Sequence, residues 1–516
     1  MKPTYGWRLD ATARSRRLAG ILTAALLGSA ILVPGTVVGA IYDSAKDPYS
    51  MKSLTAITGA TAWWNAGYTG KGVDVALIDT GVAPVEGLAT AGKIVYGPDL
   101  SLESQNPAFR YLDTNGHGTF MAGLIAGRDS TLSAPYANAP ASAYSGMAPD
   151  ARIVSVKVGT ADGGVDVSQV IAAIDWVVQH RTDNGMNIRV INLSYGTNSL
   201  QASGVDPLSY AVEQAWRKGI VVVAAAGNTG FQFGAGAPGL ANPAYNPYVL
   251  AVGGYDTMGT AATGDDVIGT YSASTNCFMC RYPDVIAVGS HVQGLRVPSG
   301  YLDLNHREGL LGDRYFRGSG TSQAAAIASG SIALLLQKYP NMSPDQVKKW
   351  LRTASSLMLK SALTGQGISV INLAAMVAST PPTEFTQSFS AATGTGTLEA
   401  ARGTDRLIDN GVVLSGEVDI FGVPFNAAAM AKAEAGAKSW TGGTWNGTAW
   451  TGSAWVDSSW AGRSWSTTAW TGRSWSGDAW AGRSWSDNTW SGRSWSGRSW
   501  SGDSWSGRSW SVGSWD

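Results

Sequence analysis

The stretch VDVALID, residues 73–79, decides which fold the chain is expected to adopt. It is a short, nearly continuous apolar run that lies between Gly72 and Gly81. A run of this kind is typical of a strand that is buried on both faces, as strands of parallel sheets are. Four further runs share this character: ARIVSVKV (151–158), IRVINLSYG (188–196), GIVVVAAAGN (219–228) and PYVLAVGG (247–254).

Helical patterns separate these apolar runs. VSQVIAAIDWVVQHR (167–181) and PLSYAVEQAWRKG (207–219) carry apolar residues at helical spacing. A later segment, SPDQVKKWLRTA (343–354), opens with a serine cap and has Pro344 at its first helical position. The alternation predicts an α/β fold with a doubly wound, mostly parallel sheet, in which ligands bind at the carboxyl ends of the strands.

Length and composition bound the organisation of the chain. The 516 residues carry 37 Lys+Arg and 37 Asp+Glu, and a net charge of zero argues against nucleic acid as the main partner. The alternation of strands and helices predicts one large domain over residues 41–380. Residues 381–436 are small and polar and are expected to form a linker with a hairpin, whereas residues 437–516 form a repetitive tail.

The first 40 residues are typical of an export signal. A basic start precedes an uncharged stretch, LAGILTAALLGSAILVPGTVVGA, that ends in the small-x-small pattern Val38-Gly39-Ala40. We therefore expect a secreted protein. The uncharged stretch is also long enough to span a bilayer, so the alternative is an uncleaved N-terminal anchor that keeps the protein at the cell surface.

A candidate nucleophile lies in GSGTSQAAAIASG, residues 318–330, where Ser322 stands among small residues ahead of an apolar helical run. A serine hydroxyl is a weak nucleophile until a neighbouring base takes its proton. His117 differs from the other three histidines because glycines flank it, in NGHGTFMAGLIAG. Glycine lets another backbone or a substrate approach the ring, so His117 is the candidate base.

An orienting carboxylate would complete such a site. Asp79 stands in VALIDTGVAP at the end of the first apolar run, where a parallel sheet holds its ligands. A surface turn is the alternative for this aspartate. The D-T-G motif is also half of an aspartic protease dyad, but the chain holds no second copy. A zinc protease is not indicated, because there is no H-E-x-x-H motif.

Together, DTG, NGHGT and GSGTSQAAA occur in the order Asp, His, Ser, and this combination resembles the subtilisin-like serine proteases over about residues 50–360. The resemblance implies that Ser322 attacks the scissile carbonyl of a protein or peptide substrate. It also implies that His117 transfers the proton and that Asp79 orients His117. The expected activity is that of a serine endopeptidase with an acyl-enzyme intermediate.

The same resemblance implies an oxyanion site. Asn228 follows a predicted buried strand, and its amide would donate to the developing oxyanion. The second donor would be the backbone N–H of Ser322, at a helix N-terminus where the helix dipole favours negative charge. A turn asparagine is the alternative for Asn228.

The resemblance further places a substrate cleft beside two backbone segments, 162–165 and 193–196, between which an extended peptide would bind. Residues 225–227 would line the first specificity pocket. The residues expected to contact the substrate are Gly163, Gly164, Ser194, Tyr195, Gly196, Ala225, Ala226 and Gly227.

Four positions depart from the family pattern. Phe120 stands where a second histidine is usual, and Gln323 replaces a methionine after the nucleophile. Ala326 replaces a proline, and Val288 stands where the family reads A-P-G. None of the four is a triad or oxyanion residue. They leave open a protease of narrow selectivity, or a catalytically weak or inactive relative.

Cysteine content and metal ligands are limited. Cys277 and Cys280 form a lone C-x-x-C, which lacks the second pair of a structural zinc site, so a local disulfide is expected in an exported protein. No cofactor is expected. Calcium is common in the family that the chain resembles, but the sequence shows no ligand cluster to which a metal can be assigned.

The segment after the export signal also departs from many relatives, which carry a folding pro-domain there. Residues 41–72 look like the start of the enzyme itself, and they leave no room for a separate pro-domain. We expect that folding needs no N-terminal chaperone, or that another segment serves as one.

The tail has tryptophan at every fifth position from Trp440 to Trp515, in units of roughly G-R-S-W-S. A helix is not expected, because five residues rotate by about 500° and scatter the rings. A β-solenoid or stacked-hairpin array and a flexible low-complexity segment are the two alternatives. Tryptophans with polar spacers suit cell-wall glycans or self-association. The alternative function is therefore that of a surface-binding protein that acts through this tail.

Overall fold

The computed structural model describes most of the chain between residues 42 and 456. The described ranges are 42–230, 239–273, 281–354, 358–360, 367–404, 406–409, 412–450 and 455–456. The expected export signal, the two cysteines and residues 457–516 of the repeat lie outside these ranges.

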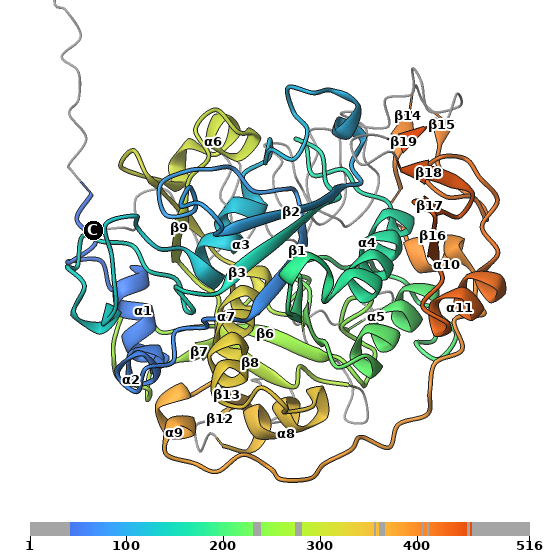
Figure 1. The fold of residues 1–516 in the computed structure, drawn as a ribbon. Helices are drawn as coiled ribbons and strands as arrows, with labels where there is room; N and C mark the ends of the chain where they lie inside the picture. The colour runs from blue at the N-terminus through green and yellow to red at the C-terminus, as the bar shows by residue number, and fades with distance from the viewer. Residues whose placement is uncertain are drawn as a thin grey trace, which may run out of the picture. The chain divides into compact units, whose positions relative to one another are not determined.

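A large, mostly parallel sheet forms the centre of the fold (Figure 1). Its strands follow the order β12-β13-β8-β6-β5-β4-β1-β3-β2, and β7 pairs with β6. Only β12 and β7 run antiparallel to their neighbours. The prediction of a mostly parallel α/β fold is confirmed. The strands of this sheet are β1 (Asp74–Asp79), β2 (Ile94–Asp99), β3 (Arg152–Lys157), β4 (Ile188–Leu193), β5 (Val221–Ala225), β6 (Leu250–Asp256), β7 (Val267–Ile268), β8 (Val285–Val288), β12 (Met358–Lys360) and β13 (Gly367–Val370).

The central strands are apolar because helices cover them. Every residue of β1, β5 and β8 is buried. The helices include two packed pairs, α3 with α7 and α4 with α5, and each pair contacts strands of the sheet. The α-helices are α1 (Met51–Ile57), α2 (Ala60–Asn65), α3 (His117–Ala126), α4 (Val167–His180), α5 (Pro207–Arg217), α6 (Tyr301–Asn305), α7 (Thr321–Lys338), α8 (Pro344–Thr353), α9 (Leu373–Val377), α10 (Leu398–Arg402) and α11 (Ala427–Ala435).

Short elements complete the fold around this core. A three-stranded antiparallel sheet, β9 (Val292–Leu295), β10 (Leu310–Leu311) and β11 (Tyr315–Gly318), leads into α7, and β9 contacts α3. Single 3₁₀ turns occur at η1 (Leu102–Gln105), η2 (Tyr136–Asn138), η3 (Asp183–Gly185) and η4 (Arg307–Gly309).

The chain after α9 returns to the helices that cover the sheet. Figure 1 shows it running as a long irregular segment around the lower edge of the fold to reach α10. Helix α10 then packs against α4, and α11 against α5. The expected linker, residues 381–436, thus includes two packed helices besides a short hairpin of β14 (Ile408–Asp409) and β15 (Val412–Val413). The division of the chain into domains stays a prediction.

The first tryptophan repeats form short antiparallel strands, β16 (Trp440–Thr441), β17 (Thr444–Trp445), β18 (Thr448–Trp450) and β19 (Trp455–Val456). Trp440 pairs with Trp445 across two strands, and Trp450 with Trp455. Trp445 is fully buried, and its Nε1 donates to Asp175 Oδ2 on α4 at 2.9 Å. The first repeats are therefore docked on α4.

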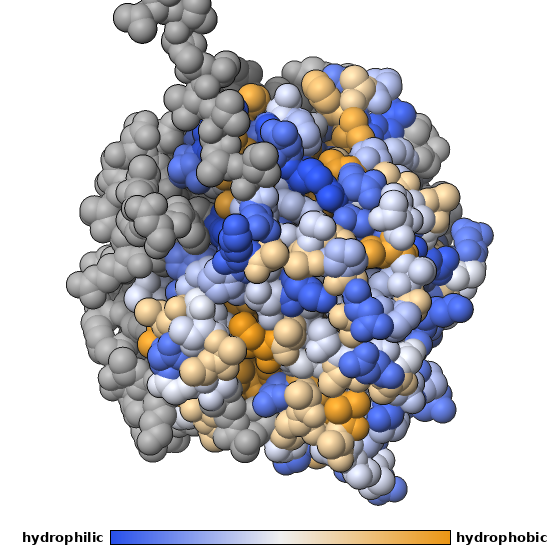
Figure 2. All heavy atoms as spheres, turned by 90° about the vertical axis from the view of Figure 1, so that its left-hand side faces the viewer, coloured by the Kyte–Doolittle hydropathy of each residue, from blue (hydrophilic) through white to orange (hydrophobic). Residues whose placement is uncertain are grey.

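The surface mixes polar and apolar residues. On the face in Figure 2, hydrophobic residues form small groups that hydrophilic residues separate. In the part of the chain that the structure describes, no helix is both long and apolar enough to cross a membrane.

Candidate active site

Three candidate residues and one further residue, Lys157, lie at or just beyond the ends of neighbouring strands of the sheet. Asp79 ends β1, and Lys157 ends β3 on one side of it. Ser194 follows β4 on the other side, and Asn228 lies three residues beyond β5. Since these strands are parallel, their carboxyl ends meet at one edge of the sheet, which is where this class of fold binds ligands.

Asp79 and His117 form a buried hydrogen-bonded pair. Asp79 Oδ1 lies 2.7 Å from His117 Nδ1, and both side chains are at most 1% exposed. Asp79 Oδ1 also accepts the backbone N–H of Thr80 at 2.7 Å. Burial raises the pKa of Asp79, while the neighbouring His117 and the hydrogen bonds oppose this rise. The contact fixes the imidazole so that Nδ1 faces the carboxylate and Nε2 faces away from it.

Close packing at the start of α3 brings the histidine to this carboxylate. His117 is the first residue of α3, and Gly118 follows it. A Cβ atom at Gly118 would lie only 2.1 Å from the carbonyl oxygen of Gly81 and 3.0 Å from Asp79 Oδ1. Any other residue at position 118 would therefore push the helix away from the loop that carries Asp79.

Asp113 holds the start of α3 in register with the same loop. Its carboxylate accepts the backbone N–H groups of Gly116 and Thr119, each at 2.7 Å. Thr80 Oγ1 donates to Asp113 at 2.8 Å and accepts the N–H of Gly118 at 2.9 Å. Asp113 thus satisfies N–H groups at a helix N-terminus, and it connects them to the residue that follows Asp79.

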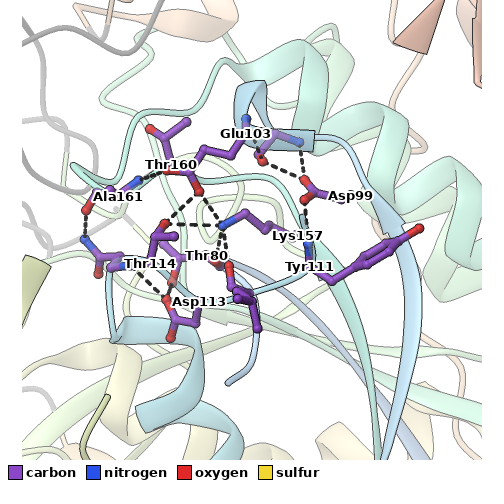
Figure 3. A network of polar contacts seen from close by, with 12 residues as sticks. Thr80, Asp99, Glu103, Tyr111, Asp113, Thr114, Lys157, Thr160 and Ala161 are labelled. Atoms are coloured by element: carbon purple, nitrogen blue, oxygen red, sulfur yellow. Dashed lines mark hydrogen bonds and ion pairs between the residues drawn. The ribbon is translucent and has the colours of Figure 1, made fainter. Parts of the chain in front are cut away.

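A buried lysine lies in the middle of the polar network beside Thr80 and Asp113 (Figure 3). Lys157 Nζ donates to the backbone carbonyls of Thr80 at 3.0 Å and Leu112 at 2.6 Å, and it forms an ion pair with Glu103 at 2.7 Å. Glu103 in turn accepts the N–H of Ala161 at 2.9 Å. The Lys157 ammonium group therefore connects Thr80, which follows Asp79, to Glu103, and Glu103 in turn holds Ala161 in the segment that follows β3.

Ser322 is the second residue of α7, the 18-residue helix that packs against α3. Its Oγ lies 3.4 Å from the backbone carbonyl of Ser194, and Ser194 Oγ lies 3.4 Å from the carbonyl of Ser322. The helix dipole places partial positive charge at this end of α7, and backbone N–H groups in the first turn have no partner within the helix. The position favours an anionic group beside Ser322.

The side chain of Asn228 lies next to the first residue of α7 in space. Its Oδ1 accepts the backbone N–H of Thr321 at 2.9 Å and Thr321 Oγ1 at 3.1 Å. Since a backbone N–H can only donate, these bonds fix which end of the carboxamide faces α7. Asn228 Nδ2 is buried and has no hydrogen-bond partner among the described residues. The side chain thus holds a donor that is oriented and available.

The segment expected to line the specificity pocket, residues 225–227, lies next to one of the two expected substrate segments. Parallel pairing of β4 with β5 places residues 194–196 beside residues 225–227. Ala241 N donates to the carbonyl of Ala226 at 2.9 Å, and Asn242 forms two 2.9 Å backbone bonds with Thr197. The segment around Ala241 therefore holds residues 194–197 and residues 225–227 together.

The other expected substrate segment lies across β1 from residue 194, because β3 and β4 flank β1 in the sheet. Gly163 and Gly164 form a turn here, in which the N–H of Gly163 donates to the carbonyl of Thr160 at 2.9 Å. The Asp162 carboxylate accepts Thr160 Oγ1 at 2.6 Å, and burial raises its pKa to about 6. The two segments thus border the edge of the sheet where Asp79 lies.

The four departures from the family pattern are all buried, and three of them are apolar. Phe120 packs its ring against Gly294 of β9. Gln323 differs, because neither atom of its buried carboxamide has a hydrogen-bond partner among the described residues. Ala326 lies within α7 and Val288 ends β8, and both belong to the core.

Two other histidines lie close to polar groups of their own segments. His180 Nδ1 lies 2.8 Å from the carbonyl of Trp176, and His306 Nδ1 lies 3.3 Å from Glu308. Cys277 and Cys280 lie outside the described residues, so the expected disulfide stays a prediction. Within the described ranges, no group of three or more His, Cys, Asp or Glu residues is placed to hold a metal, and no calcium site is assigned.

Sequence reasoning missed the supporting residues Thr80, Asp113 and Lys157. Thr80 follows the predicted site residue Asp79 and Lys157 ends a strand, but their contacts join segments that are distant in sequence. A signal was present for Asp113, because it lies just before a glycine-flanked helix start, where acidic residues cap helices.

The chain is similar to proteases of known type. A model of the subtilase family, peptidase S8, matches residues 70–396. Over 291 residues the chain is 35% identical to serine protease AprX of Bacillus subtilis, covering 56% of this chain and 62% of AprX. It is 32% identical to subtilisin DY of Bacillus licheniformis, covering 60% of this chain and 93% of that protein. A solved structure of a cold adapted subtilisin-like serine proteinase is 27% identical, with a TM-score of 0.44, over 59% of this chain and 89% of the other.

Proposed function

Because this chain belongs to the subtilase family, we propose that it is a serine endopeptidase that cleaves protein or peptide substrates through Asp79, His117 and Ser322. The observation that carries the proposal is the buried 2.7 Å contact between Asp79 Oδ1 and His117 Nδ1 at the ligand-binding edge of the sheet. It is supported by the packing of α3, which begins at His117, against α7, which carries Ser322.

In the first half of the reaction, Ser322 Oγ attacks the scissile carbonyl carbon while His117 Nε2 accepts the hydroxyl proton. Asp79 stays ionised and holds the Nδ1–H of the imidazolium. The tetrahedral intermediate carries its negative charge on the former carbonyl oxygen. Asn228 Nδ2 and the backbone N–H of Ser322 donate to this oxyanion.

The first half ends when His117 gives its proton to the leaving amine and the carbon–nitrogen bond breaks to leave an ester on Ser322. In the second half, a water molecule attacks the ester carbonyl while His117 takes a proton from the water. Collapse of the second tetrahedral intermediate releases the carboxylic acid and returns the proton to Ser322 Oγ.

The substrate is proposed to bind as an extended strand between residues 162–165 and 193–196. Backbone hydrogen bonds to both segments would align the peptide, and residues 225–227 would receive one side chain. This arrangement is supported by the position of the two segments on either side of β1.

The test is cleavage of a mixed peptide library by the full chain and by Ser322→Ala, with products identified by mass spectrometry. Cleavage at internal bonds by the wild-type chain alone supports an endopeptidase. Cleavage by both proteins to the same extent, or by neither, would overturn the proposal.

We also propose that the protein is exported and that its tryptophan repeats retain it on cell-wall glycans or on other copies of the chain. The basis is the sequence of residues 1–40 and 437–516. Binding of the Ser322→Ala protein to isolated cell wall, compared with a chain that ends at residue 456, tests retention. Equal binding of the two proteins would contradict a role for the repeats after residue 456.

A further inference from the structure

Residues 401–404, which include the end of α10, contact two separate loops of the large domain. This stretch follows residue 396, where the match to the subtilase family ends. One loop carries Asp166 and the other carries Thr197. We call residues 401–404 the brace.

Arg402 provides the first contact. Its Nε donates to Asp166 Oδ2 at 2.6 Å and its Nη2 lies 3.3 Å from Asp166 Oδ1, with both side chains 1% exposed. The remaining guanidinium donors reach the carbonyls of Gly416 and Val418. Burial alone would raise the pKa of Asp166, but the Arg402 charge and the hydrogen bonds hold it below its ordinary value. The ion pair is therefore a fully satisfied, bidentate one.

Three neighbours of Arg402 provide the second contact. The carbonyl of Ala401 accepts Thr197 Oγ1 at 2.6 Å, and the N–H of Thr404 donates to Asn198 Oδ1 at 2.7 Å. Gly403 has φ 64°, and a Cβ atom there would lie 2.3 Å from Asn198 Oδ1. Only glycine permits so close an approach in this backbone conformation.

Both contacts adjoin the segments proposed to hold the substrate. Asp166 follows residues 162–165 directly and caps α4, where it accepts the N–H of Ser168 at 2.9 Å. Thr197 follows residues 193–196 directly. The two segments emerge from β3 and β4, on either side of β1. The brace thus spans from the end of one segment to the end of the other.

We propose that the brace fixes the separation of the two substrate-binding segments, and that Arg402 is a positioning residue for extended peptides. The inference rests on the proposed function, because it assigns a role toward the same cleft. A peptide strand that bonds to a segment on each side requires a spacing of about 4.7–4.9 Å to each. A misplacement of about 1 Å in a binding site costs up to roughly 10²-fold in rate.

A role in stability alone would have a different signature. It would lower the unfolding temperature without distinguishing between substrates. The positioning role predicts a loss that depends on substrate length, because a short ester contacts only the nucleophile, the oxyanion site and the first pocket. An extended peptide needs both segments in addition.

The experiment compares kcat/KM for a short acyl ester with that for an extended peptide amide that has at least four residues before the scissile bond. The first variant is the pair Arg402→Met with Asp166→Asn, which removes both charges, leaves no unpaired buried ion and keeps a good helix cap. The second is Thr197→Val, which removes the 2.6 Å hydrogen bond to Ala401 and the longer 3.4 Å bond from the N–H of Ser199. The control is Arg406→Met, which loses an ion pair with Glu399 of the same segment but touches neither loop.

We expect kcat/KM for the extended amide to fall about tenfold or more in the double variant and by a smaller factor in Thr197→Val, while the ester stays within about twofold. Equal losses on both substrates, or no loss on the amide, would overturn the brace. If the double variant does not fold, the Thr197→Val comparison decides alone. A wild-type chain that hydrolyses neither substrate would instead show that the proposed function fails, and the brace proposal with it.

Discussion

The carboxamide oxygen of Asn228 lies 2.9 Å from the backbone nitrogen of Thr321, the first residue of the helix that carries Ser322. This bond commits the oxygen and leaves Nδ2 as the available donor next to the candidate nucleophile. The N-terminus of α7, which carries Ser322, therefore also sets the orientation of the Asn228 side-chain amide.

Replacement of Asn228 by alanine should lower kcat by about 10²- to 10³-fold with little change in KM, because it removes a donor that acts mainly on the oxyanion of the transition state. Steady-state kinetics on a peptide amide measure both constants. Asn138→Ala, at an exposed asparagine outside the site, serves as the matched control. A kcat within a factor of two of the wild-type value would remove Asn228 from the oxyanion site.

Lys157→Met should destabilise the fold by about 3–5 kcal/mol, because Glu103 and two backbone carbonyls would lose a buried cationic partner. Urea unfolding is measured in a Ser322→Ala background to prevent self-cleavage. Adding Glu103→Gln should restore part of the loss, since no unpaired carboxylate then remains. The two side chains would contribute independently, against this prediction, if Glu103→Gln destabilised the Lys157→Met protein by as much as it destabilises the Ser322→Ala protein alone.

Gln323→Met should stabilise the protein by about 1–3 kcal/mol, because neither polar atom of the buried carboxamide has a hydrogen-bond partner among the described residues. Methionine has a similar volume and no such polar group. The measurement is again the urea midpoint in a Ser322→Ala background. A lower midpoint would mean that the carboxamide makes a favourable interaction, which would point to a role near Ser322.

The fold around Asp175, where the first tryptophan repeats dock, should lose stability as the pH rises. Burial raises the pKa of Asp175 to about 7, and it also raises that of the neighbouring Glu434. A carboxyl group whose folded-state pKa is raised binds more protons folded than unfolded, so its stability contribution is lost as the pH rises from about 4 through 7. Asp175→Asn should therefore flatten this dependence, with a larger gain in unfolding temperature at pH 8 than at pH 5. An equal gain at pH 5 and pH 8 would contradict the attribution of this pH dependence to Asp175.

Much of the fold followed from local pattern. The five apolar runs correspond to β1, β3, β4, β5 and β6, because strands buried on both faces must be apolar along most of their length. Strand β2 was not anticipated. Its sequence, IVYGPD, includes glycine and proline, and it lies at the edge of the sheet, where pairing on one side tolerates both.

The candidate site could be predicted less well from the sequence where its contacts join segments that are distant in the chain. Asp79 and His117 carried local signals, a strand end and flanking glycines, and the structure places them in contact. Lys157 carried none, because a lysine at a strand end is ordinarily solvated and only the fold surrounds it with carbonyls. Arg402 lay in a segment that was expected to be a linker, and its partner Asp166 is 236 residues away.

The most direct test of the proposed catalytic triad is labelling of the purified full-length protein with a fluorophosphonate probe, with the modified residue located by mass spectrometry. We expect one adduct, on Ser322, that is lost in Ser322→Ala and strongly reduced in His117→Ala. Folded wild-type protein that stays unlabelled, or an adduct on a different residue, would contradict the claim that Asp79, His117 and Ser322 form a working catalytic triad.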